Sequence, residues 1–135
     1  NGVRSIIEDK DGYFWFNSKF RYKVYDSKQL SKNNFDSTFY SREKSIGSLD
    51  GKSDGNLIEY LSIAKDNNNE LWIATYNAGV YHYDGKDITH FTIKDGSKEI
   101  NLFTIYKDNN GNMWLGTPET GAYKFNGQKF EKFKP

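Results

Sequence analysis

Cysteine is absent from the chain, so disulfide bonds, thiolate metal sites and cysteine nucleophiles are excluded. No apolar run approaches the ~20 residues that a helix needs to cross a bilayer. Basic and acidic residues are nearly balanced, 19 against 18, and the basic residues are scattered along the sequence. This balance gives no electrostatic reason to expect nucleic acid or an anionic membrane surface as a partner.

Proline occurs only twice, whereas aromatic residues make up 17% of the chain and glycine occurs 12 times. Aromatic side chains favour strands, because a pleated and packed surface accommodates them well. Clusters of asparagine, aspartate and glycine recur at short intervals, as is typical of tight turns. The composition therefore indicates many short strands.

Three tryptophans reveal an internal repeat, because each follows an aspartate by six positions. The pairs are Asp9 and Trp15, Asp66 and Trp72, and Asp108 and Trp114. The last two copies lie 42 residues apart, and the same shift aligns Ile63 with Ile105, Thr75 with Thr117, Gly79 with Gly121, and Tyr81 with Tyr123. The first copy lies 57 residues before the second, so about fifteen residues are inserted, and we place them within 27–55. The chain is thus expected to be one domain, 1–135, with repeats of approximately 3–55, 56–100 and 101–135.

Each copy can be divided into four strands. In the third copy they are expected at 103–106, 113–117, 122–125 and 129–133, separated by Asn-Gly turns or looser links. Four short antiparallel strands in about 40 residues are typical of a β-propeller blade. We predict an all-β fold, a β-propeller with three four-stranded antiparallel blades. Tryptophan–aspartate and kelch repeats are disfavoured, because the Trp-Asp and Gly-Gly dipeptides of those repeats are missing.

The repeat has the pattern Ser-Ile-x-x-Asp-x-x-Gly-x-x-Trp-x-Gly-Thr, followed by Gly-x-Tyr-x-Tyr-Asp-Gly. The third copy follows it over 104–117 and 121–127, with Thr104 for serine, Phe125 for tyrosine and Asn126 for aspartate. The second copy follows it over 62–85, with Ala74 for a glycine and Asn69 for the turn glycine. This pattern resembles the two-component regulator propeller repeat. The resemblance implies a propeller from the extracytoplasmic sensing region of bacterial sensor proteins, with a role in ligand sensing or interaction. It implies no shared catalytic centre, so neither catalytic residues nor a cofactor is expected.

Propellers close with about 4–8 blades, whereas this chain has three. An open arc would leave two blade faces with apolar side chains uncovered, and such faces usually form interfaces. We therefore expect the chain to pair with itself as a dimer of six blades, or to belong to a longer propeller. The chain begins at Asn1 with no visible signal peptide, as expected of a processed chain or of part of a longer one.

Several motifs invite a chemical interpretation that their spacing does not support. The repeated aspartates are expected to cap backbone amides in hairpin turns, and the tryptophans to pack between blades. The stretch from Asp108 to Glu119 superficially resembles a calcium loop, but Met113 stands where such loops need glycine. The two histidines, His82 and His90, lack the spacing of a metal site or catalytic triad and are expected to be surface or hydrogen-bonded strand residues.

Loop lengths give a better indication of a binding face. In an up-and-down blade, the second and fourth connections share one face, and here they are the longer ones. The predicted ligand-binding residues are Tyr76, Asn77, Glu119 and Thr120, together with Tyr40 and Arg42 if the insertion projects to the same side. The ligand is expected to be a saccharide, by family analogy alone. The alternatives are a propeller enzyme, such as a polysaccharide lyase or hydrolase, and a structural or assembly module.

Overall fold

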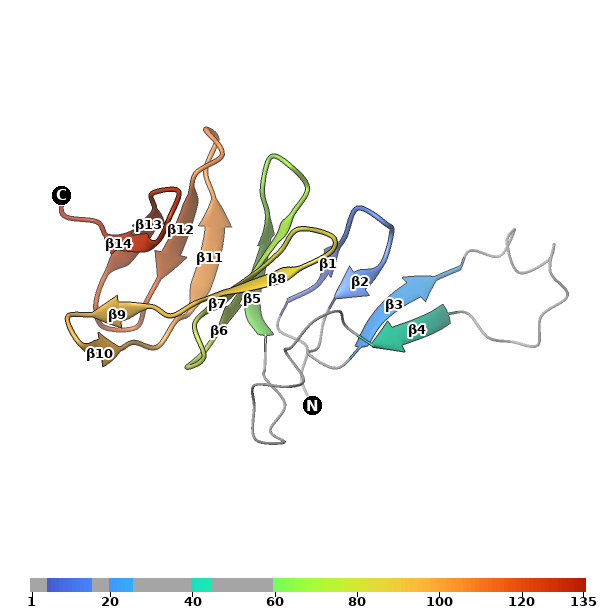
Figure 1. Cartoon of the computed structure of the whole chain (residues 1–135), viewed down its shortest axis with the longest axis horizontal. Helices are drawn as coiled ribbons and strands as arrows, with labels where there is room; N and C mark the ends of the chain where they lie inside the picture. The colour runs from blue at the N-terminus through green and yellow to red at the C-terminus, as the bar shows by residue number, and fades with distance from the viewer. Residues whose placement is uncertain (1–4, 16–19, 26–39, 45–59) are drawn as a thin grey trace, which may run out of the picture.

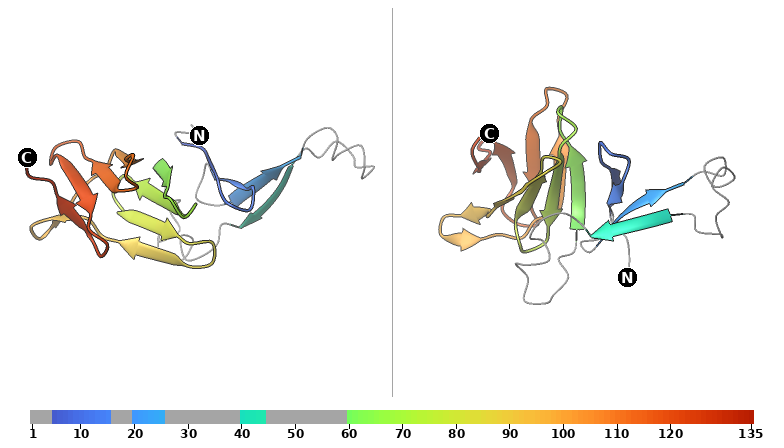
Figure 2. Two further views of the ribbon diagram at one scale, coloured as in Figure 1. Left: turned by 90° about the horizontal axis from the view of Figure 1, so that it is seen from above. Right: turned by 45° about the vertical axis from the view of Figure 1, so that its right-hand side comes forward.

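The computed structural model describes residues 5–15, 20–25, 40–44 and 60–135. The described residues form three four-stranded antiparallel sheets and one small hairpin, with no helix among them (Figure 1). This confirms the predicted all-β fold, a partial propeller. The three sheets follow one another in chain order, as the two views of Figure 2 show.

Each sheet is one blade with its strands in sequence order. Blade 1 contains β1 (Ile7–Glu8), β2 (Phe14–Trp15), β3 (Phe20–Val24) and β4 (Tyr40–Lys44). Blade 2 contains β5 (Tyr60–Lys65), β6 (Leu71–Thr75), β7 (Val80–Tyr83) and β8 (Ile88–Phe91). Blade 3 contains β11 (Thr104–Lys107), β12 (Met113–Gly116), β13 (Ala122–Phe125) and β14 (Phe130–Lys132). The hairpin of β9 (Lys94–Asp95) and β10 (Lys98–Glu99) connects blades 2 and 3.

The segment 27–55, within which the insertion is predicted, contains a strand. β4 lies inside the segment 27–55 and pairs with β3 along five residues, from Phe20 opposite Lys44 to Val24 opposite Tyr40. It is therefore the fourth strand of blade 1, and the extra residues of this repeat lie on both sides of it. The rest of 27–55 lies outside the described residues.

The spacing of six between aspartate and tryptophan has a direct physical cause. In blade 2, Asp66 Oδ1 accepts hydrogen bonds from the amides of Asn68 and Glu70, at 2.8 and 3.0 Å. Its other oxygen accepts a hydrogen bond from Trp72 Nε1 at 2.9 Å. One carboxylate thus closes the hairpin turn and orients the ring. The corresponding bonds recur at Asp9 with Asp11, Tyr13 and Trp15, and at Asp108 with Asn110, Asn112 and Trp114.

The same hydrogen bonds lower the pKa of Asp108, the turn aspartate of the third copy. The Trp114 indole N–H, followed by the amides and side chain of the turn, lowers the pKa of Asp108 to about 2. A carboxylate that accepts several hydrogen bonds is stabilised in its charged form. The predicted role of the aspartates as turn caps is confirmed, and the bond to tryptophan is an addition that the sequence did not show.

Blade 2 lies between two apolar cores. One core joins it to blade 1 and contains Trp15, Leu71, Ile73, Tyr81 and Tyr83. The other joins it to blade 3, with Trp72 packed against Phe125 and Phe130 at ring distances of 4.9 and 5.9 Å. Every residue of β6 is consequently buried, because this strand packs against a neighbouring blade on each face. Trp15 and Trp72 fill equivalent positions between successive blades, which confirms their predicted packing role.

The two outer faces of the arc lack such a cover among the described residues. On blade 3, Trp114 occupies the position of Trp72 but contacts only the edge of Phe133 in ring packing, and Tyr106 opposite it is 60% exposed. On blade 1, Ile6 is 63% exposed and Val24 is 56% exposed. These faces are the apolar surfaces expected of a propeller with three blades.

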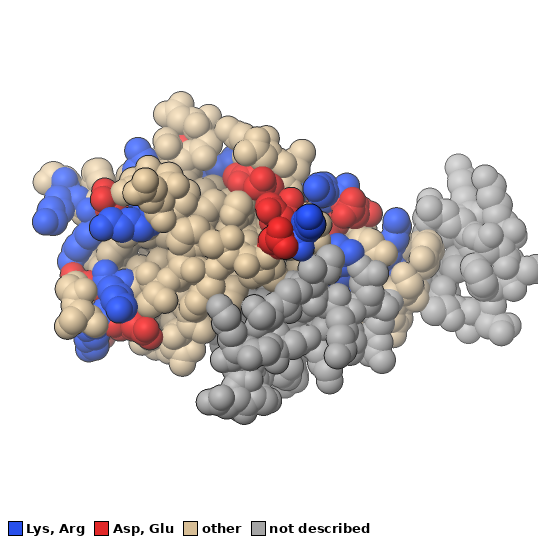
Figure 3. Space-filling view, viewed as in Figure 1, with Lys and Arg blue, Asp and Glu red and all other residues tan. Residues whose placement is uncertain are grey.

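Charged side chains of both signs are interspersed on one face of the described residues. Figure 3 shows lysine and arginine mixed with aspartate and glutamate on the face viewed, with apolar and neutral residues between them. No single-sign patch large enough to attract a polyanion is visible on this face, in agreement with the balanced composition.

Candidate functional site

The longer connections of blades 2 and 3 form a pocket of about 310 Å³ at one edge of the arc. Its walls come from the connection after β6, the β9–β10 hairpin and the connection after β12. The lining residues are Tyr76, Asp95, Lys98, Glu99, Ile100, Asn101, Pro118, Glu119 and Thr120. We call it the long-loop pocket.

Threonine at the end of the second strand fixes the shape of these connections. The Thr75 hydroxyl donates to the carbonyl of Gly79 at 2.7 Å and accepts from the amide of Ala78 at 3.0 Å. In blade 3 the Thr117 hydroxyl donates to the carbonyl of Gly121 at 2.7 Å. Both glycines have positive φ, 77° and 84°, which other residues adopt at a cost. The repeated threonines and glycines therefore hold the pocket walls in one conformation.

Tyr76 is anchored through its backbone while its ring stays accessible. Its carbonyl accepts a hydrogen bond from the amide of the buried Leu102 at 2.8 Å. Its hydroxyl accepts a hydrogen bond from Asn101 Nδ2 at 3.2 Å, and the side chain is 46% exposed. An exposed aromatic ring on a fixed backbone is suited to stacking against a ligand.

The hairpin wall is held by apolar and ionic contacts. Ile93 and Ile100 flank the hairpin, are buried in the core between blades 2 and 3, and are joined by a backbone hydrogen bond of 3.1 Å. Asp95 pairs with Lys132 of β14 at 3.5 Å. The hairpin residues that reach the pocket are acidic, basic and amide-bearing, so this wall can donate and accept hydrogen bonds.

The pocket brings together Tyr76, Glu119 and Thr120, three of the residues predicted from loop length. Asn77 lies on the same connection, is exposed, and does not line the pocket. Tyr40 is not in a loop: it lies in β4, 49% exposed, with its ring 5.8 Å from that of Tyr22. Arg42 is also a β4 residue, and its side chain lies outside the described part of the chain.

The contribution of residues 95–101 was missed by the sequence reasoning, which counted this stretch only as a long fourth connection. The sequence feature that indicates a hairpin here is Asp-Gly at positions 95 and 96, a dipeptide typical of hairpin turns, with polar residues around it. Asn101 gave no signal, because its role depends on the tertiary contact with Tyr76.

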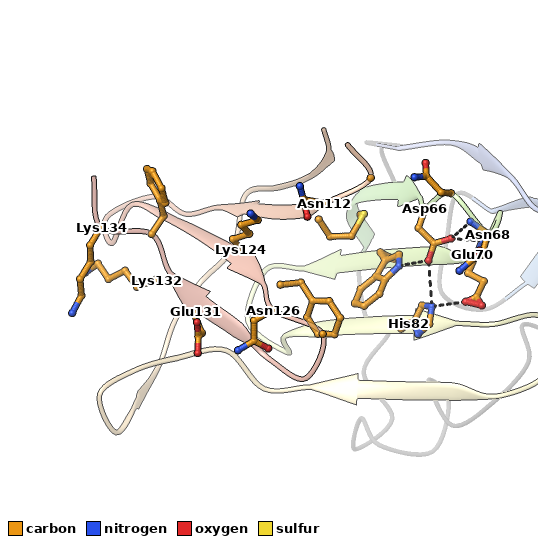
Figure 4. A pocket seen from close by; sticks show the side chains of 17 residues that line it. Asp66, Asn68, Glu70, His82, Asn112, Lys124, Asn126, Glu131, Lys132 and Lys134 are labelled. Carbon is orange, nitrogen blue, oxygen red and sulfur yellow. Dashed lines mark hydrogen bonds and ion pairs between the residues drawn. The ribbon is translucent and has the colours of Figure 1, made fainter. Parts of the chain in front are cut away.

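A second concave region of about 860 Å³ lies at the short-turn edge of blades 2 and 3 (Figure 4). His82 Nε2 lies 3.0 Å from Glu70 Oε2 and 3.7 Å from Asp66 Oδ2. The cleft also contains Asn112 and Lys124 of blade 3. We call it the short-turn cleft.

The two histidines differ in environment. His82 stacks on Trp72 with a ring distance of 4.2 Å and contacts two carboxylates. His90 stacks on Tyr81 at 4.5 Å and is hydrogen-bonded to the carbonyl of Ala78. Both are hydrogen-bonded strand residues, as predicted. The proximity of Glu70 to His82 was missed.

No helix long and apolar enough to cross a membrane occurs in the described residues. Residues 53–77 and 95–119 match the two-component regulator propeller family, and these two segments are related by the same shift of 42 residues as the repeats. No curated protein matches the chain.

Two solved structures share the fold. One is the extracellular domain of a proposed one-component system, BT4673, from B. thetaiotaomicron, with 21% identity and a TM-score of 0.57, matching 92% of this chain and 16% of that chain. The other is the extracellular domain described as a proposed hybrid two-component system, BT4673, from the same organism, with 19% identity and a TM-score of 0.55. It matches 98% of this chain and 15% of that chain. The chain thus spans a small part of the length of these structures.

Proposed function

Because the chain carries repeats of the two-component regulator propeller family, we propose that it is a non-enzymatic sensing module that binds a hydroxyl-rich ligand of the saccharide class. The observation that carries this proposal is the long-loop pocket, which combines an exposed tyrosine ring with carboxylates, an amide and a hydroxyl. A sugar presents C–H groups on its faces and hydroxyls at its edge. The ring suits the faces, and the polar groups suit the hydroxyls.

The size and rigidity of the pocket support the same class of ligand. A volume of about 310 Å³ lies at the small end of ligand sites and suits one or two sugar rings. Threonine hydroxyls and positive-φ glycines hold both connecting loops, so binding requires little ordering of the protein.

The proposal can be tested by calorimetric titration with a panel of mono- and oligosaccharides. Tyr76→Ala and Glu119→Gln should each weaken binding at least about tenfold, because each removes a pocket contact. Asn77→Ala is the matched control, since Asn77 is exposed on the same connection but does not line the pocket. Unchanged binding in both pocket variants would refute this location. Turnover of a polysaccharide would instead favour the enzymatic alternative, a lyase or hydrolase.

We propose an extracytoplasmic location for this module. The support is the family of its repeats, together with two structural neighbours that are extracellular domains. Fractionation of producing cells, with detection of the chain outside the cytoplasm, would support the location. Detection in the cytoplasm alone would refute it.

We further propose that additional blades of the same polypeptide cover the two outer faces. The equivalent residues Trp72 and Trp114 show the effect of a covering blade on exposure. Trp72 is buried against blade 3, whereas the Trp114 side chain is only partly buried. Propellers close with about 4–8 blades, and the two neighbours are several times longer than this chain.

Light scattering after size exclusion tests the proposal that further blades cover these faces: the isolated chain should show concentration-dependent association. A stable dimer would favour the other occupant, a second copy of three blades. A strictly monomeric chain at all concentrations would show that the faces do not need a cover.

A further inference from the structure

The same position carries a basic side chain in all three blades. Arg21, His82 and Lys124 each lie opposite the repeat tryptophan, in register with Trp15, Trp72 and Trp114 respectively. In blade 1 the cation pairs directly with the turn aspartate, because Arg21 Nη1 lies 3.0 Å from Asp9 Oδ2. Blade 2 therefore has an imidazole where its neighbours have permanent cations.

Blade 2 also differs at the residue four positions after the turn aspartate. That residue is Tyr13 in blade 1 and Asn112 in blade 3, but Glu70 in blade 2. As a result, only blade 2 among the described blades combines two carboxylates with an imidazole. The three groups lie together: one ligand atom from each of Asp66, Glu70 and His82 falls within 4.8 Å of the other two.

The spacing of these atoms fits a divalent transition metal. Zinc binds imidazole and carboxylate at about 2.0–2.2 Å, so adjacent donor atoms of a tetrahedral site lie roughly 3.3 Å apart. His82 Nε2 lies 3.0 Å from one carboxylate oxygen and 3.7 Å from the other, on either side of that value. Two carboxylates and a neutral imidazole carry two negative charges, which a divalent ion balances.

The surroundings fix two of the three donors before a metal arrives. Two turn amides and the Trp72 indole N–H hold the Asp66 carboxylate. The same indole ring stacks on His82 with an interplanar angle of 21°. Such outer contacts orient metal ligands and increase their affinity. All three side chains are partly exposed, with 14–24% of their surface accessible, so an ion can enter from the short-turn cleft.

We propose that Asp66, Glu70 and His82 form a binding site for a divalent transition metal, of the zinc class. The three side chains occupy one side of the ion, and the fourth position opens into the short-turn cleft. Figure 4 shows the three side chains turned toward one another at one end of that cleft. Water or a ligand atom can complete the coordination there. This site lies at the edge of the blades opposite the long-loop pocket and does not depend on the proposed saccharide binding.

Zinc chloride titration of the 135-residue chain, followed by calorimetry at pH 7.5, tests the proposal. One equivalent should bind, and Glu70→Gln should weaken binding at least about tenfold, because it removes a direct ligand while keeping the side-chain shape. His82→Lys should abolish binding, and blade 3 shows that this fold accepts lysine at that position. Circular dichroism of both variants should match the unsubstituted chain. His90→Gln is the control and should leave binding unchanged.

A gain-of-function variant provides an independent check. Asn112→Glu combined with Lys124→His transfers the donor set to blade 3, and the number of zinc ions bound should rise from one to two. Absence of zinc binding to the unsubstituted chain would overturn the proposal. So would binding that survives in folded His82→Lys or is lost in His90→Gln, since the ion would then lie elsewhere.

Discussion

Trp72 and Trp114 offer an internal comparison of what blade stacking contributes to stability. The two residues occupy the same repeat position, and each donates its indole N–H to the turn aspartate at 2.9 Å. Trp72 is 4% exposed and packs against Phe125 and Phe130 of the next blade. Trp114 is only partly buried and contacts Phe133 of its own blade.

Replacement of each tryptophan by alanine should therefore have unequal effects. Trp72→Ala should lower the free energy of unfolding by about 3–5 kcal/mol, the range for large aromatic side chains in cores. Trp114→Ala should lower it by only about 1–2 kcal/mol, mainly through the lost hydrogen bond and part of one aromatic contact. Since both variants lose the same bond to aspartate, the difference of about 1–4 kcal/mol reports mainly the contribution of the covering blade.

The assay is urea unfolding followed by far-ultraviolet circular dichroism, because tryptophan fluorescence changes with the substitutions themselves. The chain should be held at a concentration where light scattering shows a monomer, so that association does not cover Trp114. Equal losses for the two variants under these conditions would refute the reasoning. A loss at Trp114 that grows with protein concentration would instead show that another copy covers this face.

Three further predictions concern turns and loops. The pKa of Asp108 is lowered to about 2 from the ordinary aspartate value of 3.8, so the stabilising effect of this carboxylate should be complete above pH 4 and lost as the pH falls toward 2. Asp108→Asn should flatten the pH dependence of urea unfolding between these pH values. Gly79→Ala should lower the thermal unfolding midpoint more than Gly121→Ala does. A Cβ at position 79 would lie 2.2 Å from a backbone oxygen, whereas a Cβ at position 121 would meet open space, so equal decreases of the midpoint would contradict this reasoning. Asn69 has a φ of 60°, a conformation that glycine adopts freely and valine adopts only with strain. Asn69→Gly should therefore change the free energy of unfolding by less than about 1 kcal/mol, and Asn69→Val should lower it by roughly 1–2 kcal/mol. Chemical denaturation of the two variants measures both changes.

The sequence by itself determined the strands and their turns. The aspartate, the turn residue and the tryptophan act within seven residues, so their spacing reports a local hydrogen-bonded hairpin that forms the same way in each copy. The predicted strands of blade 3 differ from the observed ones by one residue at some ends, as at β11 (Thr104–Lys107). A fourth strand was predicted for blade 1, but the position of β4 was not, because about fifteen extra residues hid its repeat position.

Only the tertiary structure decided which side chains meet. Tyr76, Asn101 and Glu119 are far apart in sequence, and they share a pocket because blade 3 stacks on blade 2 and the hairpin after β8 folds over the same edge. The meeting of Glu70 with His82 depends on the register between β6 and β7, which sets His82 opposite Trp72, two residues after Glu70. Local turn chemistry repeats with the sequence and can be read from it. Contacts between blades and across strands depend on register and packing, which the spacing of residues along the chain does not determine.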